Sequence, residues 1–168
     1  MTGRVHHYAA TVAWTGDLGQ GTAGYRSFSR DHDIRMDGKP AIAGSSDPAF
    51  RGDATRHNPE DLLVGSAAAC HMLWYLHLAS QAGVIVRGYT DDATGEMTET
   101  ADGGGAFSRI VLRPRVEISA GDPGLARTLH VRAHELCFIA NSLRCPIEVE
   151  AEVVVVPQGW ATSERLGG

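Results

Sequence analysis

The sequence predicts an α+β domain, because strand-like and helix-like segments follow one another without a repeated strand–helix–strand unit. Helical signals appear twice, at 59–81 and at 122–143. Segments rich in β-branched and aromatic residues precede, separate and follow these two helices. Glycine clusters at 16–24 and 103–105 predict turns between them.

Strands are expected in five segments, which are 8–14, 25–34, 84–89 with a continuation to 99 left open, 107–118 and 147–156. Pro114 indicates a sheet edge or a bulge, because proline cannot donate a hydrogen bond to a neighbouring strand. Residues 36–57 are rich in Gly, Pro, Ser and Asp and predict a long loop. Loops of that length in a small domain are often functional.

The first helix is expected to run from Pro59 to Gln81. Asn58 is a suitable N-cap, proline is favoured at the first helical position, and the acidic Glu60 complements the positive end of the helix dipole. Gly83 can end the helix in a left-handed conformation. Beyond its first turn the segment is apolar nearly all round, which predicts a central helix covered on several sides.

The second helix is expected from Asp122 to about Leu143. Its apolar residues recur at helical spacing, namely Leu125, Leu129, Ala133, Leu136, Cys137 and Ala140. The closing strand follows directly after it.

The composition suits one compact domain over residues 1–168. The formal net charge is −5 and the basic residues are scattered, so a nucleic acid or an anionic membrane surface is not an expected partner. No run of apolar residues approaches the length of a membrane span, and the first residues lack a signal-peptide pattern. The cytoplasm is therefore the expected location.

Three cysteines in a reducing compartment argue against a structural disulfide framework. Cys70 lies far inside the apolar first helix, where burial disfavours a thiolate. It stands eleven residues after Pro59, about 16 Å along the helix, so the helix dipole does not reach it. A reactive Cys70 needs a cation from elsewhere in the fold.

Two motifs resemble those of the OsmC/Ohr family of thiol-dependent peroxidases. The first is Asn-Pro-Glu-Asp-Leu-Leu at 58–63 followed by Ser-Ala-Ala-Ala-Cys at 66–70, and the second is Ala-His-Glu-Leu-Cys-Phe-Ile-Ala-Asn-Ser-Leu at 133–143. Residues 69–78 look like an OsmC-like subgroup. The likeness extends over 8–156 and implies an OsmC-like fold, with antiparallel sheets packed around two central helices in an intertwined homodimer.

The resemblance implies that the protein reduces organic hydroperoxides. By position, Cys70 matches the family's reactive cysteine, Glu60 its glutamate, and Arg51 the arginine that stabilises the thiolate. Cys137 matches the resolving cysteine, which forms a disulfide with the oxidised nucleophile. No bound cofactor is expected, because an external dithiol or lipoyl-type reductant would return the disulfide to thiols.

Two of these assignments have alternatives. Arg56 and Arg26 are the other candidates for the arginine. Family members commonly carry Cys-Pro at the resolving position, and the only Cys-Pro in this chain is Cys145-Pro146. Cys137 is preferred because the residues after it match the family's register.

The spacing of Glu60 and Cys70 bears on assembly. Ten residues of helix separate them by about 15 Å, so both cannot act at one site within a single helix. If both serve one arginine, Glu60 comes from one chain and Cys70 from another. Packing of the small residues 65–69 against a symmetry mate would bring them together.

Two other functions remain open. A ligand-binding or structural homodimer would keep the same scaffold without turnover. His130, His134 and Cys137 lie on one helix face and, with Cys70 or His71, could bind zinc. Histidines at helical spacing more often form a packed or hydrogen-bonded face, as is also expected for His71 and His77.

Overall fold

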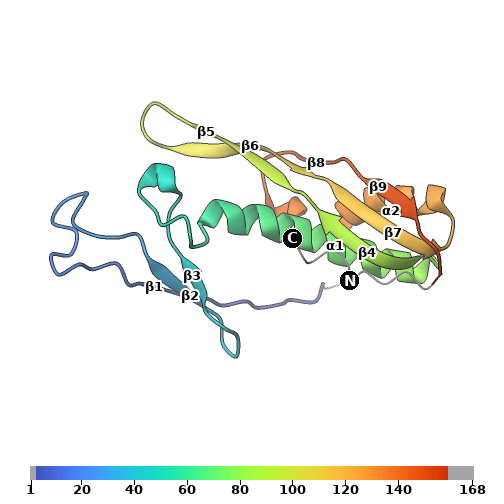
Figure 1. Cartoon of the computed structure of the whole chain (residues 1–168), viewed down its shortest axis with the longest axis horizontal. Coiled ribbons are helices and arrows are strands. Elements are labelled where there is room, and N and C mark those ends of the chain that lie inside the picture. Colours follow the sequence, from blue (N-terminus) through green and yellow to red (C-terminus); the bar gives the residue numbers. More distant parts are fainter. Residues whose placement is uncertain (1–2, 159–168) are drawn as a thin grey trace. The chain divides into compact units, whose positions relative to one another are not determined.

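The computed structural model describes residues 3–158. The chain divides into two compact units, Met1–Leu62 and Leu63–Gly168, and Figure 1 shows the order of the elements within them. The α+β class predicted from the sequence is confirmed, with small sheets and two main helices. The expectation of a single domain over 1–168 stays a prediction.

The first unit contains a three-stranded antiparallel sheet in the order β1-β2-β3. The strands are β1 Thr11–Trp14, β2 His32–Arg35 and β3 Ile42–Gly44. The expected returning strand at 25–34 therefore begins later, and β3 lies inside the segment expected to be a loop. A turn at Met36–Lys39, with Gly38 at a φ of 69°, reverses the chain so that β3 pairs with β2.

Helix α1 spans Pro59–Gln81, as predicted. The Asn58 side chain accepts a hydrogen bond from the Asp61 backbone N–H at 2.7 Å, so Asn58 is the N-cap. Among the described residues, α1 is the one helix long and apolar enough to cross a membrane by length and composition. The expectation that no apolar segment approaches that length is therefore wrong for this helix.

The second unit contains two further three-stranded sheets. One has the order β4-β7-β9 and the other β5-β6-β8. Their strands are β4 Ile85–Asp91, β5 Thr94–Glu99, β6 Gly105–Leu112, β7 Pro114–Ala120, β8 Ile147–Val149 and β9 Glu152–Val155. The sheets are mixed rather than purely antiparallel, because β8 pairs with β6 and β9 with β7 in parallel.

Each long strand expected in this unit is therefore two strands that belong to different sheets. Figure 1 shows β4 leading into β5 and β6 leading back into β7. Arg113 stands at the break between β6 and β7: its backbone N–H donates to Asp91 at 2.7 Å, and its guanidinium donates to Glu150 and Thr94 at 2.9 Å. Arg113 thus connects the three points at which the chain passes between the two sheets, namely β4 to β5, β6 to β7, and β8 to β9.

Pro114 begins β7, which is the central strand of its sheet. The expectation of an edge position or a bulge at Pro114 is wrong. A proline is tolerated there because it is the first residue of the strand.

Helix α2 spans Pro123–Leu136, and the Asp122 side chain caps it by accepting from the Leu125 N–H at 2.6 Å. It ends before the expected Leu143. Cys137 already has an extended backbone, and the Asn141 side chain donates to the Glu135 carbonyl at 2.9 Å. A short 3₁₀ turn, η2 Ala140–Ser142, follows.

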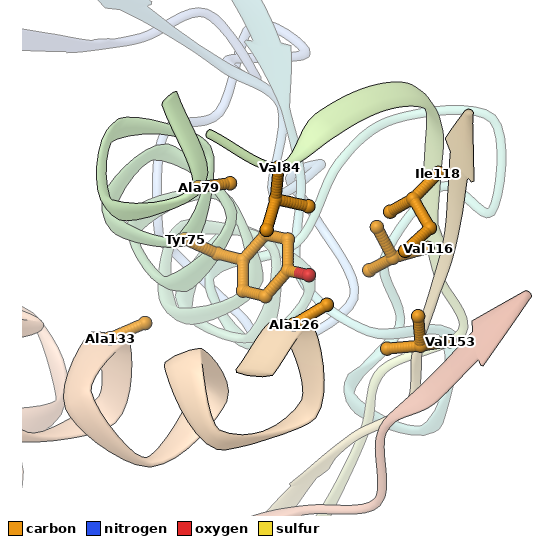
Figure 2. Packing of buried hydrophobic residues seen from close by; sticks show 8 residues of the cluster. All are labelled: Tyr75, Ala79, Val84, Val116, Ile118, Ala126, Ala133 and Val153. Atoms are coloured by element: carbon orange, nitrogen blue, oxygen red, sulfur yellow. The ribbon is translucent and has the colours of Figure 1, made fainter. Parts of the chain in front are cut away.

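The hydrophobic core lies in the second unit. Figure 2 shows Tyr75 pointing from α1 toward Val116 and Ile118 of β7, with Ala126 of α2 beside it. A second cluster forms around Ala67, Ile110 and Leu112. Among the described residues, no hydrophobic side chain before Ala67 is buried, so the first unit has no apolar core of its own.

Candidate active site

The structure brings Cys70 and Cys137 together in the second unit. Cys70 is half-buried on α1, and Cys137 lies directly after α2 with 1% of its surface exposed. The Cys70 thiol is a near neighbour of Cys137 and raises the pKa of the Cys137 thiol. No disulfide joins the two cysteines among the described residues.

The backbone around Cys137 holds its sulfur in place. The Cys137 N–H donates to the His134 carbonyl at 3.2 Å, and the Cys137 carbonyl accepts from the Asn141 N–H at 3.0 Å. Its Sγ accepts a hydrogen bond from the Ala140 N–H at 3.4 Å. The sharp end of α2 therefore fixes the position of this thiol beside Cys70.

The pKa of the Cys137 thiol is raised to about 11, chiefly by burial and further by the neighbouring Cys70 thiol. The Ala140 N–H acts in the opposite direction but is the weaker influence. Cys137 therefore stays protonated at neutral pH.

Cys145 lies in a different environment. It packs against the cluster of Ala67, Ile110 and Leu112, together with Leu143 and other partly buried apolar residues. It is half-buried and free. The choice between Cys137 and Cys145 as the resolving residue stays a prediction, and the geometry supports Cys137.

A buried histidine pair lies next to the cysteines along the same two helices. His71 of α1 and His130 of α2 share a hydrogen bond of 3.0 Å between Nε2 and Nδ1. The His130 ring also stacks on Tyr75 with 4.0 Å between ring centroids. Burial lowers the pKa of each histidine to about 4, and the neighbouring histidines contribute in the same direction.

Sequence reasoning weighed these histidines as a zinc face or as packed residues, but it did not pair them. Over residues 3–158, no three His, Cys, Asp or Glu side chains converge as a metal-ligand set. The sequence does contain a signal that His71 faces the core. His71 lies four residues from both Ala67 and Tyr75, and these three residues and Ala79 form the buried face of α1.

Arg51 lies in the first unit, at the end of the short 3₁₀ helix η1 Pro48–Phe50. It is exposed and is the one described non-glycine residue with a positive φ, 69°. The Asp47 carbonyl accepts the Gly52 N–H at 3.0 Å, and a β-carbon at position 52 would collide with the Ser46 carbonyl. The tight loop holds Arg51 in a conformation that L-residues rarely adopt, a type of strain that clusters at functional sites.

The other candidate arginines differ in their surroundings. Arg56 faces Asp31 at 3.8 Å, whereas Arg26 is exposed. The guanidinium of Arg51 lies 5.8 Å from the centre of the Tyr25 ring and is in none of the ion pairs of the described residues. Arg51 is thus available for another anion.

Glu60 is half-buried in the first turn of α1. No ion pair joins it to Arg51 among the described residues of the first unit. Arg51 and Glu60 belong to the first unit, and the two cysteines belong to the second. The assignment of all four residues to one site stays a prediction.

Comparison with known proteins identifies the family of this chain. The family described as OsmC-like protein matches residues 52–152, which include α1, α2 and both cysteines. The chain belongs to the OsmC-like family. In the second unit, α1 packs into the hydrophobic core through Tyr75 and Ala79.

Individual relatives cover nearly the whole OsmC-like chain. The uncharacterised protein YmaD of Bacillus subtilis (strain 168) is 25% identical over 157 residues, 89% of this chain and 95% of that protein. An OsmC-like protein of unknown function from Vibrio cholerae is 29% identical, with a TM-score of 0.78 over 89% of this chain and all of its own.

A second Vibrio cholerae structure, a putative organic hydroperoxide resistance protein with captopril in one of its active sites, is 26% identical. Its TM-score is 0.63, over 90% of this chain and 93% of its own. An organic hydroperoxide resistance protein from Elizabethkingia anophelis is 18% identical and shares the fold, with a TM-score of 0.64 over 92% of this chain and 100% of its own.

The histidine pair predicts a loss of stability in mild acid. The unfolded chain binds protons at these histidines below about pH 6.5, whereas the folded chain does not until about pH 4. The free energy of unfolding should therefore fall between these values, on the order of 2 kcal/mol per ring. Urea unfolding at fixed protein concentration from pH 7 to pH 4.5 measures it.

The double replacement His71→Leu, His130→Leu should flatten this pH dependence, and His77→Leu on the exposed side of α1 should not. Burial raises the pKa of Asp91, so Asp91 makes the folded state more stable as the pH falls. Because this contribution is the same in every variant, the difference in pH dependence between variants reports the histidines. Ring proton shifts give a direct check in the unmodified protein. Titration of His71 or His130 near pH 6.5 in the folded state would contradict the prediction.

Proposed function

We propose that the protein is a thiol-dependent peroxidase that reduces organic hydroperoxides. The observation that carries the proposal is the pairing of Cys70 with Cys137. One sulfur is half-buried on a helix, and the other is buried beside it at the end of a second helix. Such a pair can interconvert between two thiols and a disulfide.

The reaction follows from thiol chemistry. The Cys70 thiolate attacks one peroxide oxygen, the O–O bond breaks, and the alcohol leaves with a proton, which makes Cys70 a sulfenic acid. The Cys137 thiol then attacks the Cys70 sulfur, which forms a disulfide and releases water. A dithiol reduces this disulfide to two thiols and itself becomes a disulfide.

The two cysteines differ in the way that this order of events requires. Cys137 remains a thiol at neutral pH because its pKa is raised, so it does not compete for the peroxide. Its fixed place beside Cys70 keeps it ready to condense with the sulfenic acid. Half-burial leaves Cys70 open to a substrate.

Arg51 is the proposed cation for the Cys70 thiolate, with Glu60 holding the arginine. An arginine stays charged when partly desolvated, and its planar group offers several donors to both the thiolate and the peroxide. The left-handed backbone at Arg51 supports this role. Glycine would adopt this conformation with less strain, and strained residues cluster at functional sites.

The hydroperoxide resistance protein of Vibrio cholerae, 26% identical, supports the choice of organic hydroperoxides as substrates. We expect a dithiol or lipoyl-type reductant, and the reducing cytoplasm as the location, where three free cysteines are stable.

We further propose that the functional form is a homodimer. The first unit has no buried apolar core among its described residues, and its exposed apolar side chains include Tyr8, Val12 and Leu18. In the second unit, Leu73 of α1 is 63% exposed and Phe138 is 69% exposed. A second copy that covers these surfaces would explain both features.

Replacement of the nucleophile tests the peroxidase directly. Cys70→Ser should reduce the consumption of cumene hydroperoxide, with a dithiol as reductant, to the uncatalysed rate, because a hydroxyl does not form the sulfenic acid. Cys145→Ser is the matched control and should keep the rate. After one equivalent of peroxide, non-reducing mass spectrometry should show a Cys70–Cys137 link. Equal rates for wild type and Cys70→Ser, or thiols that do not react, would favour a binding protein instead.

Replacement of Arg51 tests the proposed cation. Arg51→Ala should raise the pH midpoint of Cys70 alkylation by about one unit or more and slow peroxide reduction about tenfold or more. Arg26→Ala, in the same unit, should change neither. If Arg51→Ala leaves the midpoint unchanged while Arg56→Ala raises it, the role belongs to Arg56.

A charge on the exposed face of α1 tests the homodimer. Sedimentation should give twice the mass of one chain for the wild type, and Leu73→Glu should weaken the association because it places a carboxylate in an apolar contact. Gln81→Glu adds the same charge to an exposed position at the end of α1 and should leave the mass unchanged. A wild-type protein that sediments as a monomer at micromolar concentration would rule out the dimer.

A further inference from the structure

A cavity of about 360 Å³ lies in the second unit beside α2, and neither Cys70 nor Cys137 lines it. Its helical wall consists of Arg127, His130, Val131 and His134, which are one face of the helix because they are three, four and seven residues apart. The volume is in the range of small-molecule sites.

Two histidines that line the cavity carry buried nitrogens without a partner among the described residues. His130 lines the cavity with 3% of its surface exposed, and its Nδ1 is hydrogen-bonded to His71, so Nε2 is its remaining ring nitrogen. Within residues 3–158, neither this buried Nε2 nor the buried Nδ1 of His134 has a hydrogen-bond partner. An unpaired buried polar group costs about 1–3 kcal/mol, so both nitrogens favour a ligand that supplies a hydrogen bond.

The charge of the cavity is positive. Arg127 is exposed and takes part in none of the ion pairs formed by the described residues. The described residues that line the cavity include no acidic side chain. A guanidinium without a carboxylate partner, next to hydrogen-bonding nitrogens, is suited to a carboxylate.

The opposite wall is apolar and limits what the rest of the ligand can be. It consists of Ile147 and Val149 of β8 and of Ala151, which follows that strand. Glu148 lies between the first two on the exposed face of the strand, so its charge does not line the cavity. The ligand therefore combines one anionic end with a short aliphatic body.

We propose that this cavity binds a small aliphatic monocarboxylate, with its carboxylate on Arg127 and the histidine nitrogens and its hydrocarbon chain against Ile147, Val149 and Ala151. The site is separate from the cysteine pair and does not depend on the peroxidase proposal. It gives a function to His130 and His134, which the thiol chemistry does not use.

Isothermal titration calorimetry with hexanoate on the reduced full-length protein tests the site. Hexanoate should bind with one site per chain, and hexan-1-ol and hexylamine should bind at least about tenfold more weakly, because they lack the charge that Arg127 pairs with. Arg127→Gln should weaken hexanoate about tenfold and leave hexan-1-ol unchanged. Arg132→Gln is the control, because Arg132 lies on the same helix but pairs with Glu135 at 2.7 Å.

A second variant tests the apolar wall. Ala151→Leu fills the cavity and should weaken hexanoate and hexan-1-ol alike. Cys70→Ser should bind hexanoate as the wild type does, which keeps this result independent of peroxidase activity. The proposal is overturned if hexanoate shows no saturable binding, or if Arg127→Gln and Ala151→Leu both leave its affinity unchanged.

Discussion

The packing of α1 against α2 is the constraint on which the second unit depends. Ala67, His71, Tyr75 and Ala79 form the buried face of α1, which carries Tyr75 into the core and His71 to His130. This contact also sets Cys70 beside the end of α2. The thiol pair is thus a consequence of core packing, and a change that separates the helices would disturb the fold and the chemistry together.

Local signals explain which parts of the fold could be predicted. The bounds of α1 follow from Asn58, Pro59 and Gly83, which act within a few residues of the helix ends. The division of the long strands did not follow from the sequence, because Arg113 ties together segments that are distant along the chain. The early end of α2 likewise depends on a side-chain contact that no periodicity reveals.

In the candidate site, too, residues in local motifs could be predicted, and contacts between distant segments could not. The family resemblance of two motifs pointed to Cys70 and Cys137, which are neighbours in the structure, while their roles stay a prediction. The histidine pair was missed because its members lie on separate helices, 59 residues apart, and each alone resembles an ordinary core histidine. The apolar wall opposite α2 was equally hidden, since β8 was expected to be part of one continuous strand.

The left-handed backbone at Arg51 lowers the stability of the fold at a residue proposed to act in the reaction. A non-glycine residue in that region costs on the order of 1 kcal/mol, and glycine would remove the cost. Selection for thermal resistance alone would therefore move position 51 toward glycine and would remove the guanidinium of Arg51. If Arg51 has its proposed role, a more heat-resistant variant obtained in this way would be a poorer peroxidase, so directed evolution would need an activity screen beside the thermal one.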